Sequence, residues 1–212
     1  MKTIKFLIPV LLLVLISCNS TKITSSWKAP GVQKSNYNKI IVFGIFNPKG
    51  RTMREYVENE LVSQLKSLGY NAVSALAEFG PKAFAKVKEE DLTAQLKSTG
   101  YDAVLTTVLL DKAQEKDYNP GNVSYQPVGY RYNRFGRYYT TIYDRVYEPG
   151  YYTTSTNYFL ESNLYDLGTS DLIYSVQSKA FSPSSSAELA NDYSKRIVKD
   201  LKTKGVLTKK NN

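Results

Sequence analysis

The spacing of apolar and polar residues predicts a strand, a helix and a second strand at the start of the folded region. Residues 39–46 form a continuous β-branched and aromatic run, which is typical of a strand buried on both faces. After a break at 47–50, apolar residues recur every three or four positions, which predicts a helix with one buried stripe. The stripe comprises Met53, Tyr56, Val57, Leu61, Val62, Leu65 and Leu68. Gly69 then suits a helix end, and 70–74 predicts a short strand.

A second segment repeats this pattern. Residues 65–73 (LKSLGYNAV) match residues 96–104 (LKSTGYDAV) at seven of nine positions. Each copy predicts a helix end, a glycine cap and an immediate buried strand. Two such units after an initial strand predict a parallel arrangement, with the third strand at 103–110. We interpret the repeat as a shared structural solution rather than as two binding sites. The polar residues 111–129 that follow are expected to form a loop.

The C-terminal part predicts a hairpin and a helix. Residues 158–165 and 172–181 partly alternate apolar and polar positions and are separated by a turn at 166–171, which is typical of two strands with one buried face. Ser185 and Glu188 match a capping box at the start of a helix. Its expected inward residues are Leu189, Ala190, Tyr193, Ile197, Val198 and Leu201. Gly205 ends the helix, 206–212 is expected to form a basic tail, and its last four residues, 209–212, are expected to be frayed.

These elements define an α/β fold with a mixed sheet of about five strands and three or four helices, in the order β-α-β-α-β, hairpin, helix. We expect a single domain over 39–205. The preceding residues 18–38 are rich in Ser, Thr and Lys and are expected to form a polar tether that lifts the domain off a membrane. Trp27, the single tryptophan, is the exception. It either docks on the domain or sits at the membrane interface, and we expect docking because of its large apolar surface.

The first eighteen residues have the layout of a bacterial lipoprotein signal. Lys2 and Lys5 precede an apolar run over 6–16, which is too short to cross a bilayer as a helix. Leu15-Ile16-Ser17-Cys18 resembles a lipobox, in which the cysteine is acylated and becomes the mature N-terminus. We therefore predict a signal peptide over 1–17 and lipidation of Cys18. An acidic run of the kind that marks surface display is missing after Cys18, which favours an outer-membrane location facing the periplasm.

Composition narrows the chemistry. The chain has no histidine, and its one cysteine is the predicted lipidation site. Histidine triads, thiol catalysis and His- or Cys-based metal sites are therefore excluded. Chemistry based on carboxylates alone stays open. We assign no catalytic residue, no metal ligand and no cofactor, and we expect a non-enzymatic protein. Removing residues 1–17 lowers the formal charge from +9 by two to +7. With an export signal, this charge favours anionic lipid or glycan over nucleic acid.

Residues 118–158 are unusually rich in tyrosine. They hold eleven of the eighteen tyrosines, with Arg131, Arg134, Arg137 and Arg145 between them. Aromatic residues favour extended chain, so we expect an excursion of ribbon and loop between strands. Three interpretations remain open: a protruding hairpin whose rings pack on one another, a recognition surface, or a ribbon that adds to the sheet of a neighbouring copy. The candidate binding residues are Tyr130, Tyr132, Arg134, Arg137, Tyr138, Tyr139, Tyr151 and Tyr152.

Several of these motifs resemble a known class of protein. The lipobox, Thr24-Ser25-Ser26-Trp27, the two Gly-Tyr junctions at 69–70 and 100–101, and the segment 161–167 (ESNLYDL) are similar to those of small envelope lipoproteins of unknown function. The domains of that class are similar in layout to the curli-secretion lipoprotein and to the amino-terminal domain of the Tol–Pal translocation protein. The resemblance implies no catalytic residue. The tyrosine-rich segment has no counterpart in those relatives, which argues against a pore-forming role.

We therefore expect a membrane-anchored envelope lipoprotein whose domain binds a glycan, lipopolysaccharide or another protein of the envelope. The alternative is a structural subunit of a homo-oligomeric envelope assembly. The oligomeric state of the chain in solution distinguishes these two hypotheses.

Overall fold

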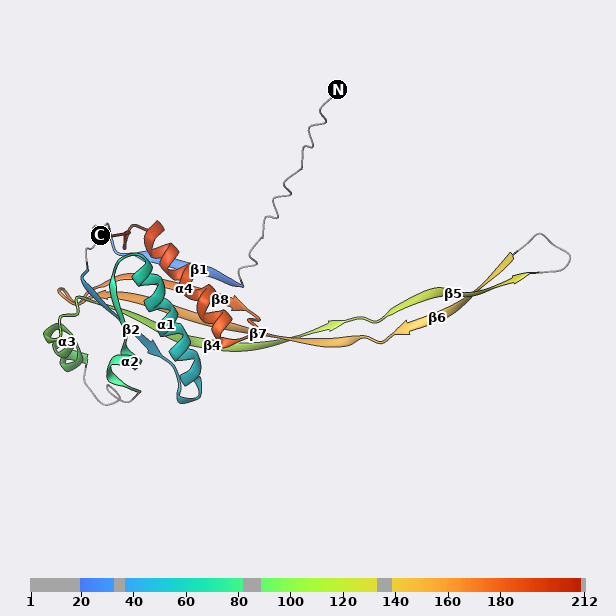
Figure 1. The fold of residues 1–212 in the computed structure, drawn as a ribbon, viewed down its shortest axis with the longest axis horizontal. Helices are drawn as coiled ribbons and strands as arrows, with labels where there is room; N and C mark the ends of the chain where they lie inside the picture. Colours follow the sequence, from blue (N-terminus) through green and yellow to red (C-terminus); the bar gives the residue numbers. More distant parts are fainter. Residues whose placement is uncertain (1–19, 33–36, 82–88, 133–138, 211–212) are drawn as a thin grey trace, which may run out of the picture.

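The computed structural model describes residues 20–32, 37–81, 89–132 and 139–210. Within these ranges the chain forms a six-stranded mixed sheet, a separate two-stranded sheet and four α-helices (Figure 1). The strand order in the larger sheet is β1-β8-β7-β4-β2-β3. The mixed α/β class predicted from the sequence is confirmed. The signal peptide at 1–17 and Cys18 lie outside the described residues.

The predicted β-α-β-α-β unit forms the parallel part of the sheet. Strand β2 (Lys39–Ile45) lies between β3 (Asn71–Ser74) and β4 (Ala103–Asn119) and is parallel to both. A short 3-10 turn, η1 (Pro48–Gly50), leads into helix α1 (Arg51–Ser67). Helices α2 (Ala75–Phe79) and α3 (Glu89–Ser98) lie between β3 and β4 in the chain.

The core lies on both faces of β2, as its unbroken apolar run predicts. Ile40 and Val42 belong to a large cluster with α1 and the C-terminal helix α4 (Ser186–Thr203). Ile41 points the other way, into a smaller cluster with Ala75 of α2 and Leu96 of α3. The six residues predicted to point inward from α4 are all buried. On α1 the predicted apolar stripe is buried at Val57, Leu61 and Leu65. Tyr56, which was predicted to belong to the stripe, is exposed, and Glu58, which was not, is buried.

The repeated Gly-Tyr junctions share one backbone geometry. Gly69 and Gly100 have φ values of 89° and 80°, in the left-handed region that glycine favours. The amides of Tyr70 and Tyr101 donate to the carbonyls of Leu65 and Leu96, five residues earlier in each case, at 3.2 and 3.1 Å. Each junction therefore ends its helix with a Schellman-type motif and starts a strand at once. This confirms the structural interpretation of the repeat.

The expected polar tether over 18–38 is wrong for its central part. Residues 21–28 form strand β1 (Thr21–Lys28), which pairs antiparallel with β8 (Leu172–Phe181) at the edge of the sheet. Ser26 Oγ donates to the Asp200 carboxylate at 2.6 Å and so ties β1 to α4. Trp27 was expected to dock on the domain, but it remains 45% exposed. The sequence of this strand is mostly polar, because an edge strand that is covered on one face needs few apolar side chains. Its hydrophobic pattern therefore did not predict a strand.

The C-terminal end also differs from expectation. Val206 and Leu207 are fully buried against the main core, and the Thr208 amide donates to the Tyr70 hydroxyl at 3.0 Å. The Lys210 amide donates to the Leu68 carbonyl at 2.8 Å. Residues 206–210 therefore pack back on the end of α1 instead of forming a loose tail, and 211–212 lie outside the described residues. Among the described residues, no helix is long and apolar enough to cross a bilayer.

Candidate binding surface: the tyrosine-rich arm

The loop predicted over 111–129 is instead part of a long two-stranded arm that projects from the domain (Figure 1). Strand β4 continues beyond the sheet to Asn119, where it pairs with the start of β7 (Tyr151–Asp166). Strands β5 (Asn122–Tyr132) and β6 (Tyr139–Glu148) then pair antiparallel and extend it. At the usual rise of a strand, the arm from residue 114 to residue 132 spans on the order of 60 Å.

A proline-glycine step interrupts both strands of the arm at the same level. Pairing runs to Asn119 and Tyr151 on one side and resumes at Asn122 and Glu148 on the other. The intervening residues are Pro120-Gly121 and Pro149-Gly150. Proline offers no amide for the ladder, and side chains at the two glycines would collide with the facing backbone and with the Tyr118 hydroxyl. The step divides the arm into a root, residues 114–119 and 151–156, and a distal part.

Exposed tyrosines gather at the arm root. Tyr118, Tyr151 and Tyr152 are 57%, 63% and 71% exposed. The rings of Tyr118 and Tyr152 face each other across the ribbon, with centroids 4.9 Å apart and an interplanar angle of 46°. Because both residues are mainly exposed, the root presents flat apolar area together with polar hydroxyl groups.

The structure brings part of the predicted binding set together. Tyr151 and Tyr152 are consecutive residues of β7 at the root, and their side chains point to opposite faces of the ribbon. Tyr130 and Tyr132 lie in β5, where Tyr132 pairs with Tyr139 of β6. These five residues therefore belong to one ribbon, in two groups separated by the proline-glycine step. The remaining candidates, Arg134, Arg137 and Tyr138, lie outside the described residues. Tyr118 was not among the candidates, although its place at the edge of the tyrosine-rich segment was visible in the sequence.

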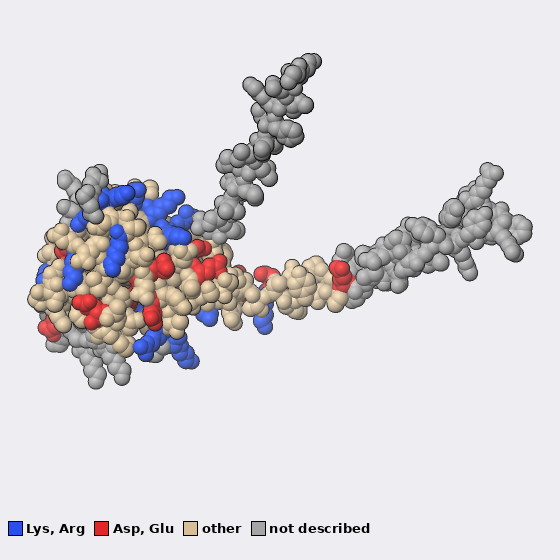
Figure 2. Space-filling view, in the orientation of Figure 1, with Lys and Arg blue, Asp and Glu red and all other residues tan. Residues whose placement is uncertain are grey.

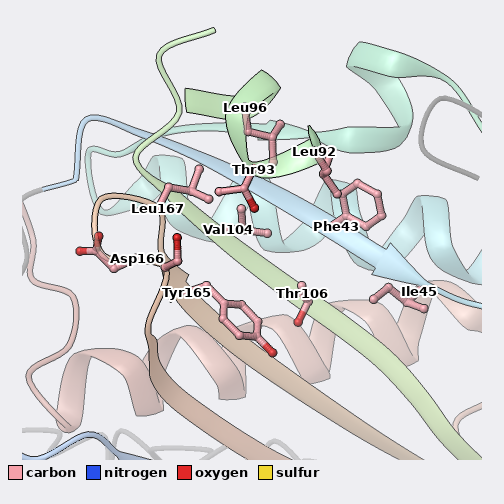
Figure 3. A pocket seen from close by; sticks show the side chains of 11 residues that line it. Phe43, Ile45, Leu92, Thr93, Leu96, Val104, Thr106, Tyr165, Asp166 and Leu167 are labelled. Atoms are coloured by element: carbon pink, nitrogen blue, oxygen red, sulfur yellow. The ribbon is translucent and has the colours of Figure 1, made fainter. Parts of the chain in front are cut away.

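A second feature missed from the sequence is an apolar hollow of about 270 Å³ beside α3. Figure 3 shows Leu92 and Leu96 of α3 above Phe43 and Ile45 of β2. Val104 and Thr106 of β4 and Tyr165 of β7 also line it. These strand residues alternate with the residues of the main core, so the hollow lies on the other face of the sheet. The sequence did not reveal this hollow, because β2 is apolar at successive positions and its two faces cannot be told apart from the residue pattern.

The domain interior also holds a buried carboxylate. Glu58 is fully buried, and its oxygens accept hydrogen bonds from the amide of Gly44 at 2.8 Å and the amide of Leu76 at 2.8 Å. Arg54 Nε and Ser74 Oγ donate to the same carboxylate at 2.7 and 2.5 Å. Four donors match the capacity of a carboxylate, so the group is satisfied by the protein itself. Its geometry suits a structural clamp between α1, β2, β3 and α2 rather than acid-base chemistry.

A chain of hydroxyls crosses the interior nearby. Thr107 Oγ1 lies 2.7 Å from Ser162 Oγ, which lies 2.6 Å from the hydroxyl of Tyr193. Burial raises the pKa of Tyr193 to about 12. Burial, followed by the hydrogen bond to Asp200, raises the pKa of Tyr174 as well. Both tyrosines therefore stay neutral. The Tyr174 hydroxyl donates to the Asp200 carboxylate, and the Tyr193 hydroxyl shares a hydrogen bond with Ser162 in which either oxygen can be the donor. Across the described residues, no group of three His, Cys, Asp or Glu side chains is arranged to hold a metal ion.

Charge on the domain surface is mixed. Figure 2 shows Lys and Arg spread over the visible face of the domain, with Asp and Glu between them. Several ammonium groups lie over aromatic rings: Lys179 Nζ is 4.7 Å and Lys22 Nζ is 5.3 Å from the ring centroid of Phe181. Both lysines lie at the end of the sheet from which the arm leaves. On the face shown, the positive side chains are thus dispersed among acidic ones.

Comparison with known proteins gives similarity of overall layout. No family model and no curated protein matches the chain. The PelC dodecamer from Paraburkholderia phytofirmans shares 11% identity, with a TM-score of 0.45 over 88% of this chain and 98% of that one. Lipoprotein GNA1162 from Neisseria meningitidis shares 14% identity, with a TM-score of 0.41 over 78% of this chain and 99% of that one. These TM-scores lie below 0.5, so the function proposed below rests on the chain's own residues.

Proposed function

We propose that the protein is a non-enzymatic lipoprotein of the cell envelope, anchored through acyl chains on Cys18, and that its arm binds another envelope component. The proposed location is the outer membrane, on the periplasmic side. The supporting observation is the arm itself, which continues β4 and β7 beyond the six-stranded sheet and exposes Tyr118, Tyr151 and Tyr152 at its root. The absence of histidine and the use of the single cysteine for the anchor support a non-enzymatic role.

The physical reason is that a bare two-stranded ribbon has little stability of its own in water. Exposed tyrosines and the two unpaired edges of the ribbon are groups that a partner can cover. Tyrosine rings stack on sugar rings, and the arginines of the segment can pair with phosphate or carboxylate. The proposed ligand is therefore a glycan, lipopolysaccharide or a protein of the envelope.

A second candidate is a structural subunit of a homo-oligomer. The same unpaired ribbon edges favour it, because a strand of a second copy can hydrogen-bond along either edge. In that case the arm contacts other copies of the chain rather than a different envelope component.

The register of the root allows the arm to be removed cleanly. Asn119 and Tyr151 are paired directly, so residues 120–150 can be replaced by an Asn-Gly turn that joins these two strands as a short hairpin. Tyr118, Tyr151 and Tyr152 of the remaining root are replaced by serine in the same variant, which we call arm-less. We expect it to keep the unfolding transition of the domain. It should also lose binding in a panel of glycans and lipopolysaccharides that the intact chain recognises. Binding should weaken at higher salt concentration, because arginine contacts are screened.

Light scattering on the intact and arm-less chains separates the two candidates. A monomer in both forms removes the homo-oligomer, whereas an oligomer that dissociates without the arm supports it. Equal binding and equal mass in both forms would show that the arm has no part in recognition.

A further inference from the structure

The residue that precedes β1 and the start of the arm lie at the same end of the sheet. The Ser20 carbonyl accepts a hydrogen bond from the Phe181 amide at 2.8 Å. Phe181 pairs with Asn157 of β7, which pairs with Ala113 of β4. These four residues form one row across the sheet, from the residue before β1 to the residue before the arm root. Figure 1 shows the start of β1, the end of β8 and the arm at this end of the sheet.

Only a short piece of chain joins this row to the proposed anchor. Cys18 precedes Ser20 by two residues, which span at most about 7 Å. Ser20 is itself held to the domain, because its hydroxyl donates to the Asp192 carboxylate at 3.0 Å. Strand β1 begins at this row and runs away from the arm. With acyl chains on Cys18, as proposed above, the bilayer surface therefore lies within roughly 10 Å of the row that borders the arm.

The arm root has two chemically different faces. Side chains of directly paired residues share a face, and successive residues alternate between faces. One face holds the pairs Gln114 with Thr156, Lys116 with Thr154, and Tyr118 with Tyr152. The other holds the pairs Glu115 with Ser155, Asp117 with Thr153, and Asn119 with Tyr151. The first, which we call the aromatic face, has two tyrosines, one lysine and no carboxylate, whereas both acids lie on the second.

We propose that the aromatic face of the arm root rests on the headgroup layer of the membrane that holds the Cys18 acyl chains. This inference depends on the proposed lipidation of Cys18. Tyrosine concentrates at membrane interfaces, where its ring meets apolar lipid and its hydroxyl meets water. Lysine ammonium groups are attracted to lipid phosphates, and carboxylates are repelled by them. The short link at Cys18 brings this face close to the bilayer and fixes the root of the arm there.

Substituted cysteines can test this contact. Because Cys18 is the single cysteine and is acylated in the proposed form, a new thiol is the one site open to a fluorescent label. Thr154→Cys places the label on the aromatic face and keeps both tyrosines. Thr153→Cys is the matched control on the adjacent residue of the opposite face. Gln95→Cys, on the exposed side of α3, reports from the other end of the domain.

The labelled full-length lipoproteins are reconstituted in phosphatidylglycerol-phosphatidylethanolamine vesicles that carry nitroxide at the headgroup. We expect the label at residue 154 to shift its emission to the blue and to lose fluorescence to the nitroxide. We expect a smaller loss at residue 153 and none at residue 95. Adding Tyr118→Ser and Tyr152→Ser to Thr154→Cys should reduce the quenching. Equal quenching at 153 and 154, or a label at 154 as exposed to water as the one at 95, overturns the proposal.

Mass spectrometry of the same samples separates this inference from the proposed function. Acylated Cys18 with an unquenched label at residue 154 overturns the membrane contact alone. A free thiol at Cys18, which would also take up label in the parent protein, overturns both the anchor and the contact.

Discussion

The Glu58 carboxylate and the Gly44 amide are joined by a 2.8 Å hydrogen bond in the interior of the domain. Gly44 lies near the end of β2, and Glu58 lies in the middle of α1. A side chain at Gly44 would lie 2.7 Å from Arg54 Cγ and 3.0 Å from the carboxylate, so the close approach of strand and helix requires glycine. The pair fixes the distance between α1 and the sheet at the point where the parallel strands end.

Replacing Glu58 by glutamine should destabilise the domain strongly. The amide nitrogen of glutamine cannot accept, so two of the four donors around residue 58 would lose their partner in the interior. Removing one member of a buried ion pair typically costs about 3–5 kcal/mol in the free energy of unfolding. Denaturant unfolding measures the change. Glu55→Gln on the exposed side of the same helix is the matched control and should change stability by less than about 0.5 kcal/mol. A similar small change for Glu58→Gln would refute the clamp.

Elements that depend on residue spacing within one segment were largely predictable from the sequence. Contacts between segments far apart in the sequence were less so. The stripe on α1, the inward face of α4 and the glycine caps at Gly69 and Gly100 depend on spacing within one element. Glu58 looked like a solvated residue of a helix, because its four donors come from elements whose arrangement no local pattern reveals. Strand β1 was missed for the same reason, since its pairing with β8 joins residues about 150 positions apart.

The arm shows the same division. Its tyrosines predicted extended chain between strands, and the distal ribbon of β5 and β6 agrees with that expectation. The pairing of Asn119 with Tyr151, which makes the arm a continuation of the main sheet, depends on long-range register. The segment and several of its candidate residues were therefore predictable from the sequence. The extension of β4 in place of a loop and the two faces of the arm root were not, because both depend on this register.

The repeated glycine caps can be tested at Gly100. Its φ value of 80° disfavours any side chain, yet a Cβ there would meet no atom within 4 Å. Gly100→Ala should therefore cost about 1 kcal/mol through backbone strain alone. Gly100→Asn should cost less, because asparagine tolerates the left-handed region. Chemical denaturation compares the two variants. Equal stability of the alanine variant and the parent protein would contradict the cap assignment.

The start of α4 should depend on Ser185. Its side chain accepts a hydrogen bond from the Glu188 amide at 3.1 Å, while the Glu188 carboxylate accepts from the amide and the hydroxyl of Ser184. These bonds from Ser184 lower the pKa of Glu188. Ser185→Ala should cost about 1 kcal/mol in unfolding free energy. Ser186→Ala, one residue into the helix, is the control and should have little effect. A comparable loss of unfolding free energy in both variants would show that Ser185 is not the capping residue.

Stability should fall as the pH rises above 10. The pKa of Tyr193 is raised from 10.0 to about 12, so between these values the unfolded chain releases a proton that the folded chain keeps. Deprotonation then favours unfolding by about 1.4 kcal/mol per pH unit for each such tyrosine. Tyr193→Phe should flatten the decline between pH 10 and 12. Its stability at pH 7 separately reports the loss of the bond to Ser162. An unchanged slope in this variant would show that Tyr193 ionises equally in both states.

The tyrosines of the arm root should be dispensable for folding. Tyr118, Tyr151 and Tyr152 are mainly exposed, so their combined replacement by serine removes little buried surface. We expect the unfolding free energy of the domain to change by less than about 1 kcal/mol, because the ring pair of Tyr118 and Tyr152 stabilises only the ribbon. Tyr193→Ser is the buried counterpart and should cost several times more, on the order of 3–5 kcal/mol, since it opens a cavity in the core. Calorimetry measures both variants. A loss of the thermal transition in the triple variant would place these rings in the core of the fold and remove them as a recognition surface.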